Sequence, residues 1–302
     1  MTNSVADFLD LTSVTRAELE WIFRRSGDWK DGVAAPPEGR LRVATVFNGP
    51  AFRTRLAFDS AIDNLGAHRV DLPLTLAQRE PIADTAAILS SAVDAVVIRH
   101  SDHDQMLELA QHSEVPVVNA MTSVGHPCEI ISEAFTLLQR RGTLDGLSVT
   151  FVGEATNLFR SWCELATQFD ISVTQVAPDG YAAPADFQEA ISERGGKLTI
   201  TTDLACGAIG ASVLYTDGWP RQACQPGTAR DAFLGVQVTT STLDLMAPGG
   251  VLMHCMPVSR GDEVTAEAFA DPRSITLAAK ANLAPTHTAI LEHVLALGCA
   301  HE

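Results

Sequence analysis

The chain has six cysteines among its 302 residues, but it lacks the spacing that would make them a metal site or a disulfide framework. No two of them form a C-x-x-C motif, which argues against structural zinc. Scattered cysteines also argue against a small disulfide-rich domain. A reducing cytoplasm therefore suits the chain best, and we expect neither a metal nor a cofactor. The cysteines are Cys128, Cys163, Cys206, Cys224, Cys255 and Cys299.

A basic stripe and a long apolar run are also missing. The formal net charge is −16 and the isoelectric point is about 4.9. Such an acidic chain is not expected to bind nucleic acid or an anionic membrane surface. No uninterrupted stretch of about 20 apolar residues occurs, and the first residues have no basic region followed by an apolar one. We therefore expect no membrane span, no signal peptide and a cytoplasmic location.

Short apolar runs rich in β-branched residues alternate with segments of helical period. This alternation is typical of parallel sheets covered by helices on both faces. Strands are expected at Leu41–Phe47, Ala95–Ile98, Val115–Asn119, Ser148–Val152, Ser172–Val176, Leu198–Thr201, Val213–Tyr215 and Val251–His254. Helices are expected at Arg16–Ser26, Thr54–Leu65, Ile82–Ser91, Asp104–His112, Cys128–Arg141, Leu158–Phe169, Asp186–Arg194 and Thr286–Leu297.

The length of the chain favours two α/β domains, each with its own core. The predicted helix Cys128–Arg141 ends at Gly142 and separates the two series of strands. This helix is the best candidate for the bridge between the domains.

The segment Gly49–Arg55, between the first strand and the next helix, is suited to an anion. The first amides of a helix point outward at the positive end of its dipole. Arg53, Thr54 and Arg55 add charged and hydroxyl donors for phosphate oxygens. The alternative is an ordinary helix start that follows a proline and carries solvated arginines.

Polar residues follow several other predicted strands, where ligands of open α/β sheets collect. A histidine before a proline is more often a loop residue than a catalyst, and a lone cysteine more often packs than reacts. The order of the whole set is more informative than any member. The set is Arg99 with His100, His126 to Glu129, Asn157, Tyr215 to Asp217, and His254 to Pro257.

In this order the segments resemble the aspartate/ornithine carbamoyltransferase family over nearly the whole chain. The stretch around Phe52 and the run Pro257 to Arg260 look more like the branch that acts on N-acylated ornithine. The matching segments are Phe47 to Phe58, Arg79 to Ala86, Arg99, His126 to Glu129, Gly142 to Gly153, Tyr215 to Asp217, Met253 to Pro257 and Arg260 to Thr265.

The resemblance implies two doubly wound parallel-sheet domains whose last helix returns to the first domain. We place the carbamoyl-phosphate domain at residues 1–130, the acceptor domain at 131–280 and the returning helix at 281–302. The resemblance also implies transfer of a carbamoyl group from carbamoyl phosphate to an amine, within amino-acid metabolism. It further implies a homotrimer, or a multiple of trimers, whose active sites are shared between subunits.

The same resemblance assigns roles to the residues. Arg53, Thr54 and the loop amides would neutralise the phosphate, while Thr54, Arg99 and His126 would donate to the carbonyl oxygen as it becomes an oxyanion. Asp217 and Cys255 would orient the attacking amine, and Asn157 would bind the acceptor's carboxylate. The expected catalytic residues are Thr54, Arg99, His126 and Cys255. The expected substrate-binding residues are Ala51, Phe52, Arg53, Thr54, Arg55, Glu129, Asn157, Asp217, Arg221, Cys255 and Met256.

Four positions depart from the family pattern. Ala51 replaces a serine of the phosphate loop, and Glu129 replaces the glutamine that follows His-Pro-x. An ionised carboxylate only accepts hydrogen bonds and would repel a nearby phosphate dianion. Leu283 replaces an arginine after Asn282, and Arg221 begins a run where many ornithine enzymes have Ser-Met-Gly.

Three functions stay open on these grounds. The first is a carbamoyltransferase whose amine acceptor is not plain ornithine. The second is a repurposed enzyme that acts on a ureido or guanidino compound in place of carbamoyl phosphate, with Glu129 as the partner of its N–H groups. The third is a non-catalytic paralogue that binds or assembles, because a fold does not determine its chemistry.

Overall fold

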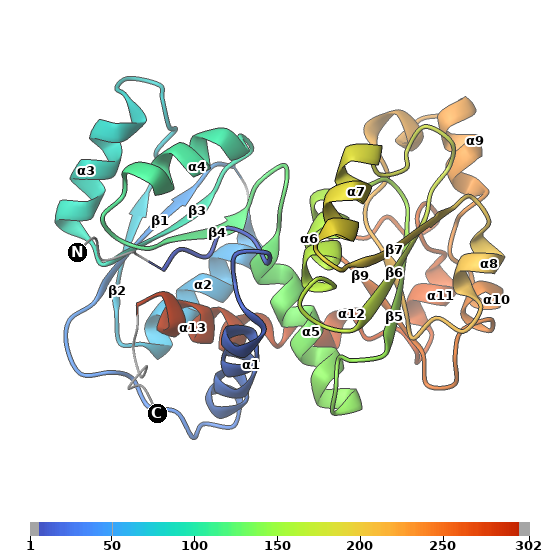
Figure 1. The fold of residues 1–302 in the computed structure, drawn as a ribbon, viewed down its shortest axis with the longest axis horizontal. Helices are drawn as coiled ribbons and strands as arrows, with labels where there is room; N and C mark the ends of the chain where they lie inside the picture. The colour runs from blue at the N-terminus through green and yellow to red at the C-terminus, as the bar shows by residue number, and fades with distance from the viewer. Residues whose placement is uncertain (1–5, 50, 296–302) are drawn as a thin grey trace. The chain divides into compact units, whose positions relative to one another are not determined.

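A computed structural model describes residues 6–49 and 51–295 of the chain. The fold consists of two compact units (Figure 1). The first unit contains the chain up to Thr136 and the segment that begins at Ala281, and the second is Leu137–Lys280. Helix α5 (Pro127–Arg141) crosses this division. Within the described residues, no helix has the length and apolarity needed to cross a membrane.

The first unit has a four-stranded sheet in which all strands are parallel. The strand order is β2-β1-β3-β4, so each strand after the first is reached by a helical crossover. The strands are β1 (Arg42–Phe47), β2 (His68–Leu72), β3 (Ala95–Arg99) and β4 (Val117–Met121). The helices are α1 (Arg16–Lys30), α2 (Phe52–Asn64), α3 (Ile82–Ala92), α4 (His103–His112), the first part of α5, and α13 (Leu283–Val294).

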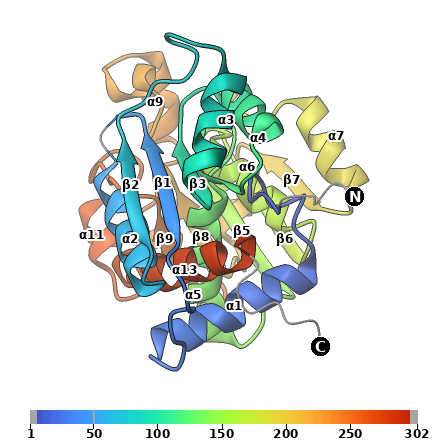
Figure 2. The same ribbon diagram turned by 90° about the vertical axis from the view of Figure 1, so that its left-hand side faces the viewer.

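Helices cover both faces of this sheet (Figure 2). Ala44 and Val46 of β1 pack in one core with the buried side chains of α3 and α4. Phe47, the next residue with its side chain on the opposite face, contacts Phe58 of α2 with 6.2 Å between ring centroids. Helix α13 packs against α1 and α2. Because both faces are buried, β1 and β3 are almost continuously apolar.

The second unit has a five-stranded parallel sheet with the order β7-β6-β5-β8-β9. The strand order runs outward from β5 to β7 on one side and from β8 to β9 on the other. The point between β5 and β8, where the order reverses, is the kind of switch point at which ligands bind. The strands are β5 (Leu147–Val152), β6 (Ile171–Val176), β7 (Lys197–Thr201), β8 (Val213–Thr216) and β9 (Val251–His254). The helices are α6 (Asn157–Leu165), α7 (Ala185–Glu193), α8 (Leu204–Ala208), η1 (Arg221–Cys224), α9 (Thr228–Leu234), α10 (Thr240–Leu243), α11 (Ala266–Ala270) and α12 (Thr276–Lys280).

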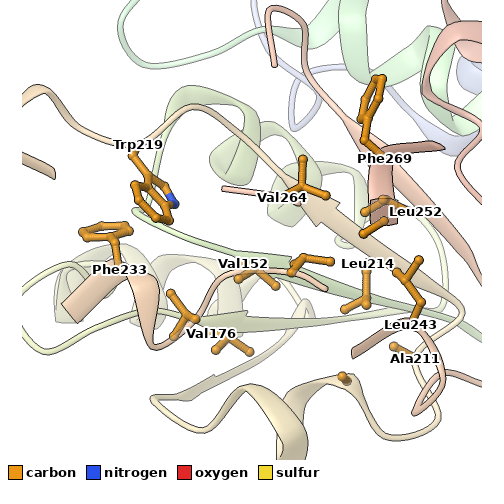
Figure 3. Close-up of a cluster of buried hydrophobic side chains, with 14 of the residues drawn as sticks. Val152, Val176, Ala211, Leu214, Trp219, Phe233, Leu243, Leu252, Val264 and Phe269 are labelled. Atoms are coloured by element: carbon orange, nitrogen blue, oxygen red, sulfur yellow. The ribbon is translucent and has the colours of Figure 1, made fainter. Parts of the chain in front are cut away.

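The core of the second unit also has two sides. On one side, strand residues such as Leu214 and Leu252 pack with Phe233 of α9 and Leu243 of α10 (Figure 3). On the other side, an aromatic cluster joins β5, β8 and α6. Its members are Phe151, Phe159, Trp162 and Tyr215, with neighbouring ring centroids 5.3 to 5.8 Å apart. Burial on both faces holds the carboxyl ends of these strands in a rigid frame.

The two-domain parallel α/β fold predicted from the sequence is confirmed, and the differences lie in individual elements. Strand β2 was missed because this edge strand is polar and its residues are half-buried or exposed. The expected helix Leu158–Phe169 is wrong at its end, since α6 stops at Leu165. The end of the expected helix Thr286–Leu297 lies outside the described residues, and α13 begins earlier, at Leu283.

Candidate functional site

Three strands of the first unit end at a common edge that carries most of the predicted donor residues. Phe47, the last residue of β1, is in register with Arg99, the last residue of β3. Arg99 is in turn in register with Met121 at the end of β4. Helix α2 begins shortly after β1, and His126 stands immediately before α5. The parallel topology therefore gathers these segments at one edge of the sheet.

The start of α2 is open to an anion. Ala51 is the N-cap residue, and no described side chain caps the helix there. The first bond of the helix is donated by the Arg55 amide to the Ala51 carbonyl, at 2.8 Å, so the preceding amides point out of the helix end. The first turn contains no acidic residue. This end of the dipole is therefore positive, with no anion of its own nearby in the sequence.

Arg99 and Thr54 meet at this helix start. The guanidinium Nη1 of Arg99 donates a hydrogen bond of 2.9 Å to Thr54 Oγ1. Thr54 is only 7% exposed, whereas Arg99 is half-buried. The bond joins the end of β3 to the first turn of α2. It brings two predicted catalytic residues together and holds both as donors at one place.

The two arginines beside Thr54 differ in their surroundings. The Arg53 guanidinium lies over the Phe52 ring, 4.6 Å from its centroid, and Phe52 is 63% exposed. Arg55 pairs with Asp71 at 3.0 Å and donates to the Phe47 carbonyl at 3.2 Å. Arg53 therefore stays near the open helix end, while Arg55 fastens α2 to β1 and β2.

His126 and Glu129 are buried together at the start of α5. His126 Nε2 and Glu129 Oε2 are 4.0 Å apart, which is too long for a hydrogen bond. The intervening Cys128 donates from Sγ to the Asn119 carbonyl at 3.3 Å. Burial raises the pKa of the Cys128 thiol, and Glu129 raises it further. Cys128 is therefore a structural thiol rather than a nucleophile.

The start of α13 approaches the same helix. Asn282 Nδ2 donates a 2.8 Å hydrogen bond to Thr136 Oγ1 of α5, which anchors α13 to α5. Leu283 is buried, so the position where the family has an arginine is apolar here. One turn farther on, His287 is fully buried and stacks on Phe58. His287 was not predicted from the sequence, because nothing in its local pattern distinguishes it from a surface histidine.

In the second unit the predicted acceptor residues also follow parallel strands. Asn157 is the first residue of α6, after β5. Asp217 follows β8, and its Oδ1 accepts a 2.8 Å hydrogen bond from the Gly218 amide. The Cys255 amide donates to the Thr216 carbonyl at 3.2 Å, which continues the pairing of β8 with β9. The topology thus places Asn157, Asp217 and Cys255 at the carboxyl edge of the sheet, each half-buried.

A buried histidine holds the loop that carries Cys255. His254 Nε2 lies 3.0 Å from the Pro257 carbonyl, and its Nδ1 lies 2.8 Å from Thr216 Oγ1. Burial lowers the pKa of His254 to about 4, although the Pro257 contact acts in the opposite direction. The neutral ring therefore donates from Nε2 to Pro257 and accepts at Nδ1 from the Thr216 hydroxyl. The Met256–Pro257 peptide bond within this loop is cis.

Glu263 completes the support of this loop. One carboxylate oxygen accepts a 2.6 Å hydrogen bond from the Ser259 amide and lies 3.5 Å from His254 Nε2. Burial raises the pKa of Glu263, and the nearby charges of Asp262 and Asp217 raise it further. Both residues lie in segments that match the family, but no role was predicted for either. Their contact depends on how the loop after β9 folds back, which the sequence pattern does not show.

The remaining predicted acceptor residues are Arg221 and Met256. Arg221 is exposed at the start of η1. Met256 is half-buried against the apolar core of the second unit. Within the described ranges, no three His, Cys, Asp or Glu side chains gather closely enough to hold a metal ion.

The similar proteins and solved structures named here are all ornithine carbamoyltransferases. An ornithine carbamoyltransferase of Symbiobacterium thermophilum is 33% identical over 303 residues, which cover 96% of this chain and 98% of that protein. One from Acidothermus cellulolyticus is 37% identical over 276 residues, or 88% of each chain. The structure of ornithine carbamoyltransferase from Pyrococcus furiosus matches with a TM-score of 0.90 and 30% identity, covering 98% of this chain and 99% of that one.

Family descriptions match both units. Residues 6–139 match "Aspartate/ornithine carbamoyltransferase, carbamoyl-P binding domain". Residues 145–294 match "Aspartate/ornithine carbamoyltransferase, Asp/Orn binding domain". With the two parallel sheets and the polar residues at their carboxyl edges, these matches show that the chain belongs to the aspartate/ornithine carbamoyltransferase family of transferases.

Proposed function

We propose that the chain transfers the carbamoyl group of carbamoyl phosphate to the amine of a small amino-acid-like acceptor other than plain ornithine. The observation that carries the donor half of this proposal is the 2.9 Å bond between Arg99 and Thr54 at the open start of α2. It sets a guanidinium and a hydroxyl side by side at a positive helix end. Both groups donate, as the leaving phosphate and the carbonyl oxygen require.

In this mechanism Arg53 and the outward amides of α2 bind the phosphate and neutralise its charge as it leaves. Thr54, Arg99 and His126 donate to the carbonyl oxygen, whose negative charge grows during attack. The donors stand in place before the reaction, because β3, α2 and α5 are fixed by the packing of one unit. Because the negative charge on the oxygen is largest in the transition state, these hydrogen bonds are strongest there.

The acceptor half rests on the loops of the second unit. Asp217 and Cys255 orient the attacking amine, which must be neutral and in line with the carbonyl carbon. Asn157 binds the acceptor's carboxylate, and Met256 provides an apolar wall. The His254 contacts with Thr216 and Pro257 support this assignment, because they hold Cys255 in a rigid loop.

The proposal of an acceptor other than ornithine rests on the residues that follow Asp217. The similar proteins named above are called ornithine carbamoyltransferases. Arg221 adds an exposed guanidinium here, where many ornithine enzymes have small and apolar residues. A guanidinium favours an acceptor with one more anionic group than ornithine. A diamino acid whose side chain or N-acyl group carries a further carboxylate fits this chemistry.

One observation favours the second candidate function, action on a ureido or guanidino compound. Glu129 is a buried carboxylate at the edge that holds the donor residues. A carboxylate accepts hydrogen bonds, and a guanidino or ureido group offers N–H donors to it. A non-catalytic chain would have no substrate for the donors of the Arg99–Thr54 pair.

A phosphate-release assay tests the proposal. Purified protein is incubated with carbamoyl phosphate and each member of a panel containing ornithine, N-acylated ornithines, other diamines and amino acids. We expect release with at least one acceptor that carries an additional anionic group, and less with ornithine. Release with ornithine alone would contradict the acceptor proposal. No release with any acceptor, together with turnover of a guanidino compound, would favour the second candidate.

We also infer a homotrimer, or a multiple of trimers, in the cytoplasm. Phe52 and Leu56 of α2 and Ile88 of α3 are exposed by 63%, 61% and 59%. Phe52 and Leu56 stand one helical turn apart on α2, and neighbouring exposed apolar side chains suit a contact with another subunit. Light scattering coupled to size exclusion measures the assembly directly, and a monomer would contradict the inference.

A further inference from the structure

A short loop, residues 122–125, leads from the end of β4 to His126. The Thr122 amide donates to the Gly125 carbonyl at 2.8 Å. The Val124 and Gly125 amides donate in turn to Thr122 Oγ1, at 3.3 and 3.2 Å. Thr122 is fully buried. One buried threonine therefore closes this loop on itself, immediately before the histidine that we propose as a donor to the carbonyl oxygen.

The Thr122 hydroxyl also meets a side chain of α4. His103, the first residue of that helix, has Nδ1 2.9 Å from Thr122 Oγ1. A hydroxyl has one proton and two lone pairs. Because two backbone amides donate to the lone pairs, the proton is available to His103 Nδ1, which accepts it when the ring carries its own proton on Nε2. His103 thereby joins α4 to the loop 122–125.

Backbone bonds tie the same loop to the segment that follows β3. The His100 amide donates to the Met121 carbonyl at 3.0 Å. The Ser123 amide donates to the Ser101 carbonyl at 3.2 Å. The loop before His126 is therefore bonded directly to the residues that follow Arg99. Two of the proposed oxyanion donors stand at the ends of these joined segments, so the bonds that fix the loop also bear on where the second donor lies relative to the first.

We propose that Thr122 and His103 are positioning residues of the donor site, which hold the loop 122–125 so that His126 meets the carbonyl oxygen. The inference rests on the proposed function, because the position of His126 matters only if His126 is a donor. Neither Thr122 nor His103 acts on the substrate itself. A displacement of about 1 Å at a reacting centre can cost on the order of 100-fold in rate. A loop held by hydrogen bonds on several sides limits such a displacement.

Two pairs of variants test the inference. Thr122→Val removes the hydroxyl at nearly constant volume, whereas Thr122→Ser keeps it. His103→Leu removes both ring nitrogens, whereas His103→Asn keeps an acceptor, Oδ1, at the place of Nδ1. His112→Leu, at the exposed end of α4, is the control.

The first measurement is hydrogen exchange of the Val124 and Gly125 amides, followed by NMR without substrate. In His103→Leu both amides should exchange about threefold faster or more, because Thr122 keeps its place as their acceptor but loses the partner that holds it. The ring signals of His126, assigned from His126→Gln, should shift in the same variant. His103→Asn and His112→Leu should resemble the wild type in both respects.

The second measurement is kinetic. In Thr122→Val and His103→Leu, kcat for carbamoyl transfer should fall about tenfold or more, while KM for carbamoyl phosphate stays close to that of the wild type. A misplaced oxyanion donor weakens binding of the transition state rather than of the ground state, which gives this division. Thr122→Ser and His103→Asn should recover most of the lost kcat.

Unchanged exchange in His103→Leu would overturn the inference, and so would a normal kcat in variants whose loop exchanges faster. Equal losses in the removing and the conserving variants would overturn it as well. If Thr122→Val does not fold, the His103 pair decides alone. A wild-type protein without carbamoyl-phosphate turnover would contradict the proposed function. Exchange and the His126 ring signals would still decide whether Thr122 and His103 position His126, since unshifted ring signals beside faster exchange would show that they do not.

Discussion

Two helices of the first unit begin at the same edge of the same sheet, yet their first turns carry opposite charge. Helix α2 begins after an uncharged alanine cap, with arginines and no acid in its first turn. Helix α5 begins at Pro127 with Glu129 in its first turn, next to His126. The backbone gives both starts a positive dipole end. Only the first is left for an external anion, since the second has a carboxylate of its own.

The comparison separates what a scaffold provides from what side chains decide. A helix start at the carboxyl edge of a parallel sheet is suited to an anion wherever it occurs. At α2 the side chains reinforce this tendency, because Arg53 and the Arg99–Thr54 pair add donors. At α5 the positive helix end faces a carboxylate of the helix itself, Glu129 in the first turn. Three variants alter one helix start or the other, and a fourth compares a buried histidine in each unit; they follow from the largest expected effect to the smallest.

The largest effect tests whether the two starts act on one oxygen. Arg99→Ala and His126→Ala should each lower turnover by about 100-fold or more, because each removes a donor to the developing charge. The double variant should lose less than the product of the single losses, since groups that act as a unit are not additive. Steady-state kinetics measures all three. Arg69→Ala, which removes a surface partner of Asp59, is the control and should keep near-normal turnover. Multiplicative losses would place the two residues in separate roles.

The next effect removes a cation from the start of α2. Arg53→Ala should weaken the binding of a phosphonate analogue or of inorganic phosphate by about 1.5 to 3 kcal/mol, the range for a charged hydrogen bond. Isothermal calorimetry measures the affinity. Arg24→Ala changes an exposed arginine of α1 and should bind as the wild type does. Unchanged affinity in a folded Arg53→Ala protein would show that the start of α2 is not the anion site.

A smaller effect makes the two starts more alike. Glu129→Gln should keep or raise carbamoyl transfer and shift its pH optimum upward. A carboxylate beside the phosphate dianion is tolerated only in its protonated, neutral form. That form is lost as pH rises, whereas glutamine stays neutral, so the variant works at higher pH. If a guanidino or ureido compound is the substrate, the variant should instead lose about 1.5 to 3 kcal/mol of substrate binding.

Kinetics of Glu129→Gln with both donor classes decides between these outcomes. Lost carbamoyl-phosphate turnover would contradict our account of Glu129. Unchanged kinetics with both donors would leave it as a residue that only stabilises the helix start through the dipole. Glu20→Gln, on the exposed part of α1, is the matched control for the loss of one carboxylate.

The smallest effect concerns stability and compares a buried histidine in each unit. Burial lowers the pKa of both His287 and His254 from 6.5 to about 4. Between these values the unfolded chain binds protons that the folded protein does not, so stability falls as pH decreases from about 6.5 to 4. His287→Phe should reduce this pH dependence, whereas His68→Gln, at an exposed position, should not. Thermal melting across this pH range measures it. A slope unchanged in His287→Phe would contradict the assignment of a neutral buried ring.

Much of the fold and some of the site could be predicted from local patterns. Continuous apolar runs marked β1 and β3, because strands buried on both faces leave no polar alternation. The anion-binding character of Gly49–Arg55 was visible because a helix start and its arginines are neighbours in the sequence. The same reasoning missed β2, whose polar residues have the composition of a loop, and the short helices from α8 to α12.

The sequence by itself determined the parallel α/β class, the family and the identity of the polar residues at each strand end. These depend on local periodicity and on segments in a definite order. Only the tertiary structure decided which residues meet: Arg99 with Thr54, Asn282 with Thr136, and His287 with Phe58. The reason is physical. Hydrogen bonds and charge interactions act over a few ångströms of space, while their partners stand tens or hundreds of residues apart in the chain.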